Sequence, residues 1–387
     1  MIKGRWTILA AAVTLAACAP ESAVEEGPRQ LVATQVTAFG DAEGEGALSS
    51  VWSVAVSTDG HVYLSEPQFA RVVAFNPDGT FDRVVGGRGD GPGEFRIPTL
   101  LTWRGDSLAV GDFQRGISLF GPDGAYVTSV SFTLTDGASA FGIRPIILLP
   151  DGSVAALSIA GNSDVTSGAV AHEFWLKTSR DGVIVDTLAR VPLEGRLYEA
   201  EVNGRGGSGM HPMAWSDLVA TPPDGSSLVF VRRPAAEASG AATYQVVRVG
   251  PDGDTLATAA LSYEPVPLTD AHVDSITTEM AERWAAMAEA TVPAAAAAIK
   301  AQLPWPAYQP PVTAVMAGSD GSVWLRREMA GTPAARWEVF DANLSPMGWV
   351  ELPKALDVKV VARDGFYAVE LDEMDVPRVV RYTVGAP

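Results

Sequence analysis

Arginine side chains and one histidine are the groups in this sequence whose chemistry points most directly to a binding site. The chain carries a formal net charge of −18, so cations that recur between its apolar runs need a reason. The planar guanidinium group of arginine can pair with a carboxylate, phosphate or sulfate through two hydrogen bonds. The candidate ligand-binding residues are Arg96, Arg144, Arg232, Arg326 and His211, the last of which follows a glycine-rich run.

Acidic residues in the same segments offer a structural alternative. Glu66, Asp112 and Glu173, among others, lie close in sequence to arginines and could satisfy them through internal ion pairs. Both interpretations stay open at this point, because a loop histidine or a loop arginine is often simply solvated.

Cys18 is the only cysteine of the chain. Lys3 and Arg5 precede an apolar run, residues 6–17, that is too short to span a bilayer and is typical of a secretion signal. The run ends in Leu-Ala-Ala-Cys, which resembles the lipobox of bacterial lipoproteins. We therefore expect residues 1–18 to be a lipoprotein signal peptide and Cys18 to carry the lipid.

Composition then limits the partners of the exported part. Removal of residues 1–18 takes away two basic residues and no acidic one, so the mature chain is still more acidic and is unsuited to nucleic acid or to electrostatic docking on anionic lipid. With its cysteine used for lipid, it keeps none for a disulfide, a zinc site or a thiol nucleophile. Residues 19–29 lack apolar periodicity and predict a flexible tether.

Tight turns divide residues 30–387 into repeating units. A first series of turns lies between two apolar runs and comprises Asp59-Gly60, Gly105-Asp106, Asp151-Gly152, Asp224-Gly225, Asp320-Gly321 and Asp364-Gly365. A second series follows in the first five units, beginning with Asp78-Gly79 and ending with the degenerate Asp341-Ala342-Asn343. Two hairpins per unit predict a four-stranded antiparallel meander. Six such units predict an all-β, six-bladed β-propeller.

The sixth unit ends one strand short. Residues 31–39 precede the first unit and read as a lone strand, so we expect this N-terminal strand to complete the last blade.

Residues 62–100 resemble an NHL-type repeat with its Gly-Pro-Gly-Glu-Phe loop, and residues 108–127 repeat the pattern more weakly. The plan of residues 30–387 is similar to that of six-bladed propeller lipoproteins of bacteria. This resemblance implies a scaffold rather than a particular reaction.

All long insertions fall on one face of such a ring, opposite the tight turns. The largest, between the fourth and fifth blades, predicts a helical hairpin over residues 268–303, with Thr269 or Asp270 as N-cap. Val273, Ile276, Met280, Trp284 and Met287 form its apolar stripe. The stripe either packs the hairpin onto the propeller or serves as a lid for a partner.

The expected function is a membrane-anchored, extracytoplasmic binding or protein-interaction scaffold that uses this long-loop face. The alternative is a hydrolase or lyase at the mouth of the central channel. The predicted innermost strands are apolar or hydroxylated, so we expect no metal, no cofactor and, on balance, no catalysis. The expected partners are the membrane, through Cys18, and an anionic ligand or envelope protein. Ala19 after the cysteine favours an outer-membrane location facing the periplasm or the exterior.

Overall fold

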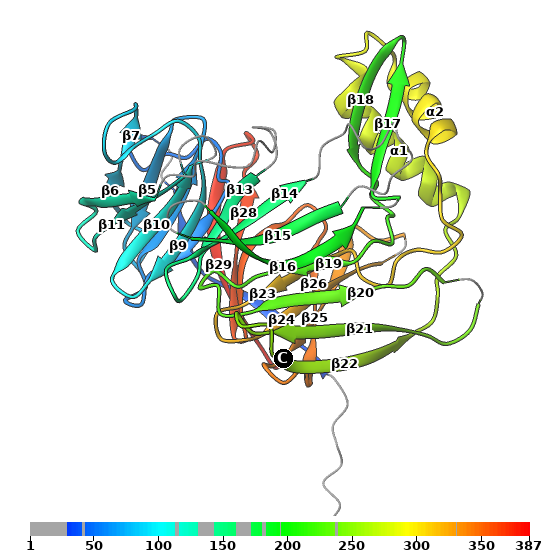
Figure 1. Cartoon of the computed structure of the whole chain (residues 1–387). Helices are drawn as coiled ribbons and strands as arrows, with labels where there is room; N and C mark the ends of the chain where they lie inside the picture. The colour runs from blue at the N-terminus through cyan, green and yellow to red at the C-terminus, as the bar shows by residue number, and fades with distance from the viewer. Residues whose placement is uncertain are drawn as a thin grey trace, which may run out of the picture.

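The computed structural model describes residues 29–387 except 41–42, 113–115, 131–142, 160–171, 180–182, 194, 237–238 and 330. Six blades, each a four-stranded antiparallel meander, make up the described part of the chain, and the fifth carries Arg29–Gln30 as an additional parallel strand (Figure 1). The predicted signal peptide, Cys18 and nearly all of the predicted tether lie outside the described residues. No helix in the described part of the chain is long and apolar enough to cross a membrane.

The blades are formed by consecutive strands. The first three are β3 (Val54–Val56), β4 (Val62–Glu66), β5 (Arg71–Phe75), β6 (Phe81–Val85); β9 (Pro98–Arg104), β10 (Ser107–Asp112), β11 (Gly116–Phe120), β12 (Tyr126–Val130); and β13 (Ile143–Leu148), β14 (Val154–Ile159), β15 (His172–Thr178), β16 (Ile184–Pro192). The last three are β19 (Leu218–Ala220), β20 (Leu228–Arg232), β21 (Ala242–Val249), β22 (Thr255–Tyr263); β23 (Ala314–Ala317), β24 (Val323–Glu328), β25 (Ala334–Phe340), β26 (Pro346–Pro353); and β27 (Asp357–Ala362), β28 (Gly365–Leu371), β29 (Pro377–Gly385) with β2 (Val32–Phe39).

Asp-Gly-Ser sequences make the tight turns for a local physical reason. In the third blade, the Asp151 carboxylate accepts hydrogen bonds from the backbone N–H of Ser153 at 2.9 Å and from its hydroxyl at 2.5 Å. Gly152 takes a φ of 80°, which a residue with a Cβ adopts only at a cost. Asp320 and Ser322 repeat these bonds in the fifth blade. The turns therefore identify the hairpins correctly.

The N-terminal strand closes the ring, as the sequence predicted. β2 pairs antiparallel with β29, from Val32 opposite Gly385 to Phe39 opposite Val379. Just before it, β1 (Arg29–Gln30) pairs in parallel with β26 of the fifth blade. The first described residues thus bridge the two last blades.

Apolar clusters fill the junctions between neighbouring blades. Phe95, fully buried at the end of the Gly-Pro-Gly-Glu-Phe loop, packs between the first and second blades, so that loop has a structural role here. It contains the short parallel pair β7 (Gly87–Arg88) and β8 (Glu94–Phe95). Among the described residues, only the third and fourth blades share no such cluster. This junction is the least apolar in the described ring.

Two faces of the ring differ in what they carry. The turn face bears the tight turns, and the loop face bears the connections between second and third strands and between blades. Both large insertions leave from the loop face: β17 (Leu197–Val202) with β18 (Arg205–Met210), and α1 (Asp270–Ala285) with α2 (Val292–Gln302). Figure 1 shows these four elements grouped together at the top of the molecule, and we call them the cap.

The helices of the cap agree with the predicted hairpin. Thr269 is the N-cap of α1, and its side chain accepts a hydrogen bond from the backbone N–H of His272. Val273 and Met280 of the predicted stripe are buried, whereas Met287 is 64% exposed. The two helices pack mainly against each other and against β17, and no blade residue belongs to their apolar cluster. The sequence predicted a loop where β17 and β18 lie, so this hairpin is an addition to the prediction.

Candidate functional site: the cleft beneath the cap

A cleft of about 970 Å³ lies between α1 and the loop face of the fifth blade. Its wall on the cap side comes from α1, including Ser275 and Ile276. Its other wall comes from the fifth blade: Thr313 just before β23, the end of β24, described residues that follow β24, and Lys354 with Ala355 in the connection to the sixth blade. We call this cavity the cap cleft. Its volume is at the upper end of the range of about 300–1,000 Å³ that is usual for ligand pockets.

Three cations from distant parts of the chain line the cap cleft. Arg283 is exposed in the last turn of α1 and makes no hydrogen bond or ion pair with the described residues. Arg326 projects from β24, and Lys354 follows β26. Both pair with Glu328, at 3.1 Å and 3.3 Å. Glu279 of α1 also lines the cap cleft, so the three cations face two carboxylates and the lining keeps one net positive charge.

The hydrogen-bonding capacity of Arg326 is only partly used. Its Nη2 contacts Glu328, whereas its Nε is buried without a hydrogen-bond partner among the described residues. A buried donor without a partner costs about 1–3 kcal/mol. Thr313 also donates to Glu328, at 3.2 Å, so the carboxylate is fixed in place.

Apolar side chains make up much of the remaining wall. They include Met213, Leu268, Ile276 and Met329. Methionine adapts its shape to different partners, because its thioether chain is unbranched and flexible. A ligand with an anionic end and an apolar body would match this combination. No group of three His, Cys, Asp or Glu side chains that could hold a metal ion occurs among the described residues.

Of the three expected arginines whose side chains the structure describes, Arg326 alone lines the cap cleft. Arg96 forms a two-pronged pair with Asp90, at 2.7 Å and 2.9 Å. Arg232 is exposed at the end of β20 and does not line the cap cleft. Arg144 lies in β13, but its side chain falls outside what the structure describes.

Several other loop-face arginines are engaged by carboxylates or carbonyls. Arg71 pairs at 2.7 Å with Glu66, which is fully buried. Arg196 lies 3.4 Å from Glu173. Arg233 is buried and donates to the carbonyl oxygens of Ser216 and Val312. These arginines therefore serve in internal ion pairs and hydrogen bonds, which is the structural alternative that the sequence left open.

His211 is buried at the base of the cap. Its Nδ1 accepts the backbone N–H of Met213 at 3.1 Å, and its ring meets Trp305 edge-on at 4.9 Å between centroids. Nε2 has no hydrogen-bond partner of ordinary geometry among the described residues. Burial lowers the pKa of His211, and the backbone of Pro304 partly offsets that effect. The side chain is next to the cap cleft, which Pro212 and Met213 line, rather than in it.

The glycine-rich run before His211 is explained by packing. It forms β18, and a Cβ at Gly207 would collide with the indole ring of Trp284 on α1. Asn203 and Gly204 make the turn with positive φ values of 51° and 74°. Asn-Gly is a strong hairpin signal and could have revealed β17–β18 from sequence. No comparable sequence pattern indicated that Arg283 and Lys354 belong to the site.

No protein-family model and no curated protein matches the sequence. Solved structures resemble it over most of its length. A proposed exported protein of Bacteroides fragilis has a TM-score of 0.50 at 12% identity, over 92% of this chain and 95% of that chain. The likeness is one of fold. Virginiamycin B lyase of Staphylococcus aureus has a TM-score of 0.41 at 12% identity, over 91% and 99% of the two chains. Regucalcin of Agrobacterium tumefaciens, a calcium-binding protein, has a TM-score of 0.35 at 10% identity, over 93% and 96%.

Proposed function

We propose that this chain is a lipid-anchored, extracytoplasmic binding protein whose cap cleft holds an anionic ligand or the acidic segment of an envelope protein. The observation that carries the proposal is the meeting of Arg283, Arg326 and Lys354 in one large cleft of a chain whose net charge is −18. Elsewhere on the loop face, Arg71, Arg96 and Arg196 are paired with carboxylates.

The direction of the chain supports an outward-facing cleft. β2 begins at Val32, opposite Gly385, on the turn face, and the cap leaves from the loop face. Residues 19–29 would reach about 36–40 Å if fully extended. A lipid on Cys18 would therefore attach the domain through its turn face and leave the cap cleft on the face opposite the point of attachment.

The three cations should contribute unequally to the free energy of ligand binding. Arg283 is exposed, so a pair with it should be worth about 0.2–1 kcal/mol and should weaken with salt. Arg326 is more enclosed, with a side chain 26% exposed, so a hydrogen bond to its guanidinium should be stronger. Most of the remaining affinity would come from apolar contact along α1 and the fifth blade.

Photo-crosslinking in cells tests the proposal. A photoreactive residue at Ser275, an exposed position of α1 that lines the cap cleft, should give a discrete adduct. Combining Arg283→Glu with Lys354→Gln should reduce that adduct at least several-fold while the melting temperature changes little. Arg190→Glu, an exposed charge on β16 away from the cleft, is the matched control and should leave the adduct intact. Adducts that are insensitive to Arg283 and Lys354 would contradict the proposal.

The anchor has its own test. Cys18→Ser should abolish incorporation of labelled palmitate and should shift the protein from the detergent phase to the aqueous phase, because two or more acyl chains supply the membrane affinity. Unchanged partitioning together with unchanged labelling would show that the chain is not a lipoprotein.

A further inference from the structure

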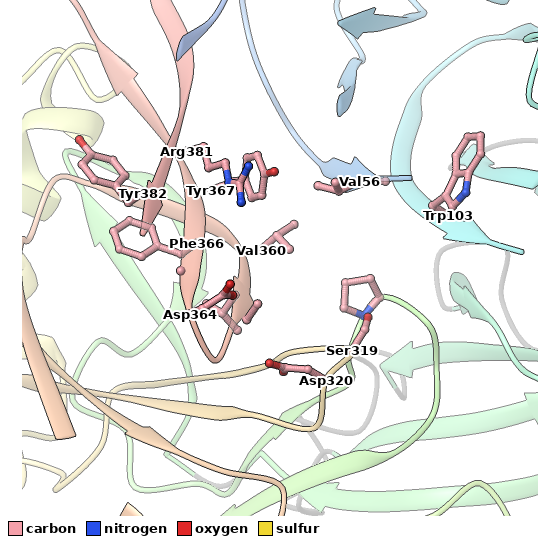
Figure 2. Close-up of a pocket in the computed structure, with 15 residues that line it drawn as sticks. Val56, Trp103, Ser319, Asp320, Val360, Asp364, Phe366, Tyr367, Arg381 and Tyr382 are labelled. Atoms are coloured by element: carbon pink, nitrogen blue, oxygen red, sulfur yellow. The ribbon is translucent and has the colours of Figure 1, made fainter. Parts of the chain in front are cut away.

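A second cavity, of about 370 Å³, opens at the turn-face mouth of the central channel. Five of the six blades contribute to it, through Val56, Trp103, Pro223, Ser319 and Val360 in chain order. Figure 2 shows Val56, Trp103, Ser319 and Val360 around a common space. The cavity is on the opposite face from the cap cleft. Its volume falls within the range of small-molecule pockets.

One wall of this cavity carries an unpaired cation and an unpaired carboxylate. Arg381 and Asp364 both line it, and neither side chain makes a hydrogen bond or ion pair with the described residues. The charges of both residues act on the hydroxyl of Tyr367. Burial raises the pKa of this hydroxyl, the positive charge of Arg381 opposes that rise, and the negative charge of Asp364 adds to it. In Figure 2 the Arg381 guanidinium lies beside the Tyr367 ring, and Asp364 comes from the adjacent β27–β28 turn.

The other carboxylate in the cavity is already committed. Asp320 accepts hydrogen bonds from the hydroxyl of Ser322 at 2.6 Å and from the backbone N–H of Arg363 at 2.6 Å. These bonds lower its pKa even though burial opposes them. Its negative charge is therefore used in fixing the two turns. Arg381 and Asp364 remain as the groups that a ligand would meet.

We propose that the turn-face cavity binds a small zwitterion with an apolar body, of the size and kind of a free apolar amino acid. The ligand carboxylate would lie against Arg381 and the Tyr367 hydroxyl, and its ammonium group would lie against Asp364. The apolar body would contact Val56, Val360 and the Trp103 ring.

A zwitterion suits this wall better than a single charge does. A simple carboxylate bound to Arg381 would lie close to the charge of Asp364, and a simple amine bound to Asp364 would lie close to Arg381. Both arrangements add a repulsion that weakens binding. A molecule with both charges places each of them beside its opposite. Arg381 and Asp364 are both exposed, so each contact alone is weak and the combination of the two decides the preference.

Calorimetric titration of the full-length protein with three probes tests this. Phenylalanine, 3-phenylpropanoate and phenethylamine share an apolar body and differ in charge. We expect phenylalanine to bind about tenfold more tightly than either of the others. Arg381→Gln should remove the advantage of phenylalanine over phenethylamine, and Asp364→Asn should remove its advantage over 3-phenylpropanoate.

Two control variants change cations that do not line the turn-face cavity. Arg363→Gln changes a neighbouring exposed cation that does not line the cavity, and it should leave all three affinities unchanged. Arg283→Glu with Lys354→Gln should also leave them unchanged, since those residues line the cap cleft on the other face. Equal affinity for the three probes, no saturable binding of phenylalanine, or phenylalanine binding that survives both Arg381→Gln and Asp364→Asn would overturn the inference.

Discussion

Single residues show why most loop-face arginines are not free for a ligand. Glu66 is fully buried, and a buried carboxylate is tolerated only when it is paired and hydrogen-bonded. Arg71 and the backbone N–H of Ser49 supply those partners, at 2.7 Å and 2.8 Å. Arg283 has no such carboxylate among the described residues. The chemistry available for binding therefore depends on which cations the fold leaves unpaired.

The buried side chain of His211 predicts how the stability of the protein depends on pH. Its pKa in the folded protein is lowered by burial, so the unfolded chain binds more protons than the folded one between the folded pKa and the ordinary value of 6.5. Stability is then fully present above about pH 6.5 and is lost as the pH falls below that value. We expect urea denaturation to show this loss as the pH falls below about 6.5, and His211→Gln to reduce it. An identical pH profile in the variant would argue that His211 is not the group responsible.

Individual elements follow local sequence signals except where packing overrides them. The Asp-Gly turns and the Thr269 cap predicted hairpins and helix from a few residues each. β18 was missed, because glycines at 206, 207 and 209 argue against a strand by propensity. Gly207 is there because the Trp284 ring leaves no room for a side chain. That requirement comes from α1, far along the chain, and no local pattern reveals it.

Gly207→Val tests this account of the cap. The introduced side chain should push β18 away from α1 and expose Trp284, and the expected signs are a red-shifted tryptophan fluorescence and faster proteolysis within the cap. The overpacking should cost about 1–3 kcal/mol. Adding Trp284→Ala should relieve part of that cost, because it removes the ring that the introduced side chain would strike. A strictly additive double variant would mean that the two residues do not pack together.

The whole molecule decides where distant residues meet. The ring and its closing strand could be predicted, since regular turns and one missing strand are visible in the sequence. The cap cleft could be predicted only in part. Arg326 was identified, but Arg283 belongs to a helix and Lys354 to a short connection, and only the folded cap over the fifth blade brings the three to one cavity.

Ring closure by β2 predicts a strong effect of N-terminal truncation. A chain beginning at Ser50 loses β2 and the buried Phe39, and it leaves β29 with an unpaired edge. Loss of a buried phenylalanine side chain alone costs about 3–5 kcal/mol. A chain beginning at Gln30 keeps the strand and should melt far higher. Equal melting temperatures and solubilities for the two chains would refute the closure.

The central claim is that partners bind on the loop face beneath the cap, away from the membrane. The most direct measurement compares photoreactive residues on the two faces in intact cells: Ser275 in the cap cleft and Asp106 in an exposed tight turn of the second blade. We expect a discrete adduct from Ser275, lost with Arg283→Glu and Lys354→Gln, and none of the same size from Asp106. The same adduct from Asp106, or an adduct from Asp106 alone, would contradict it.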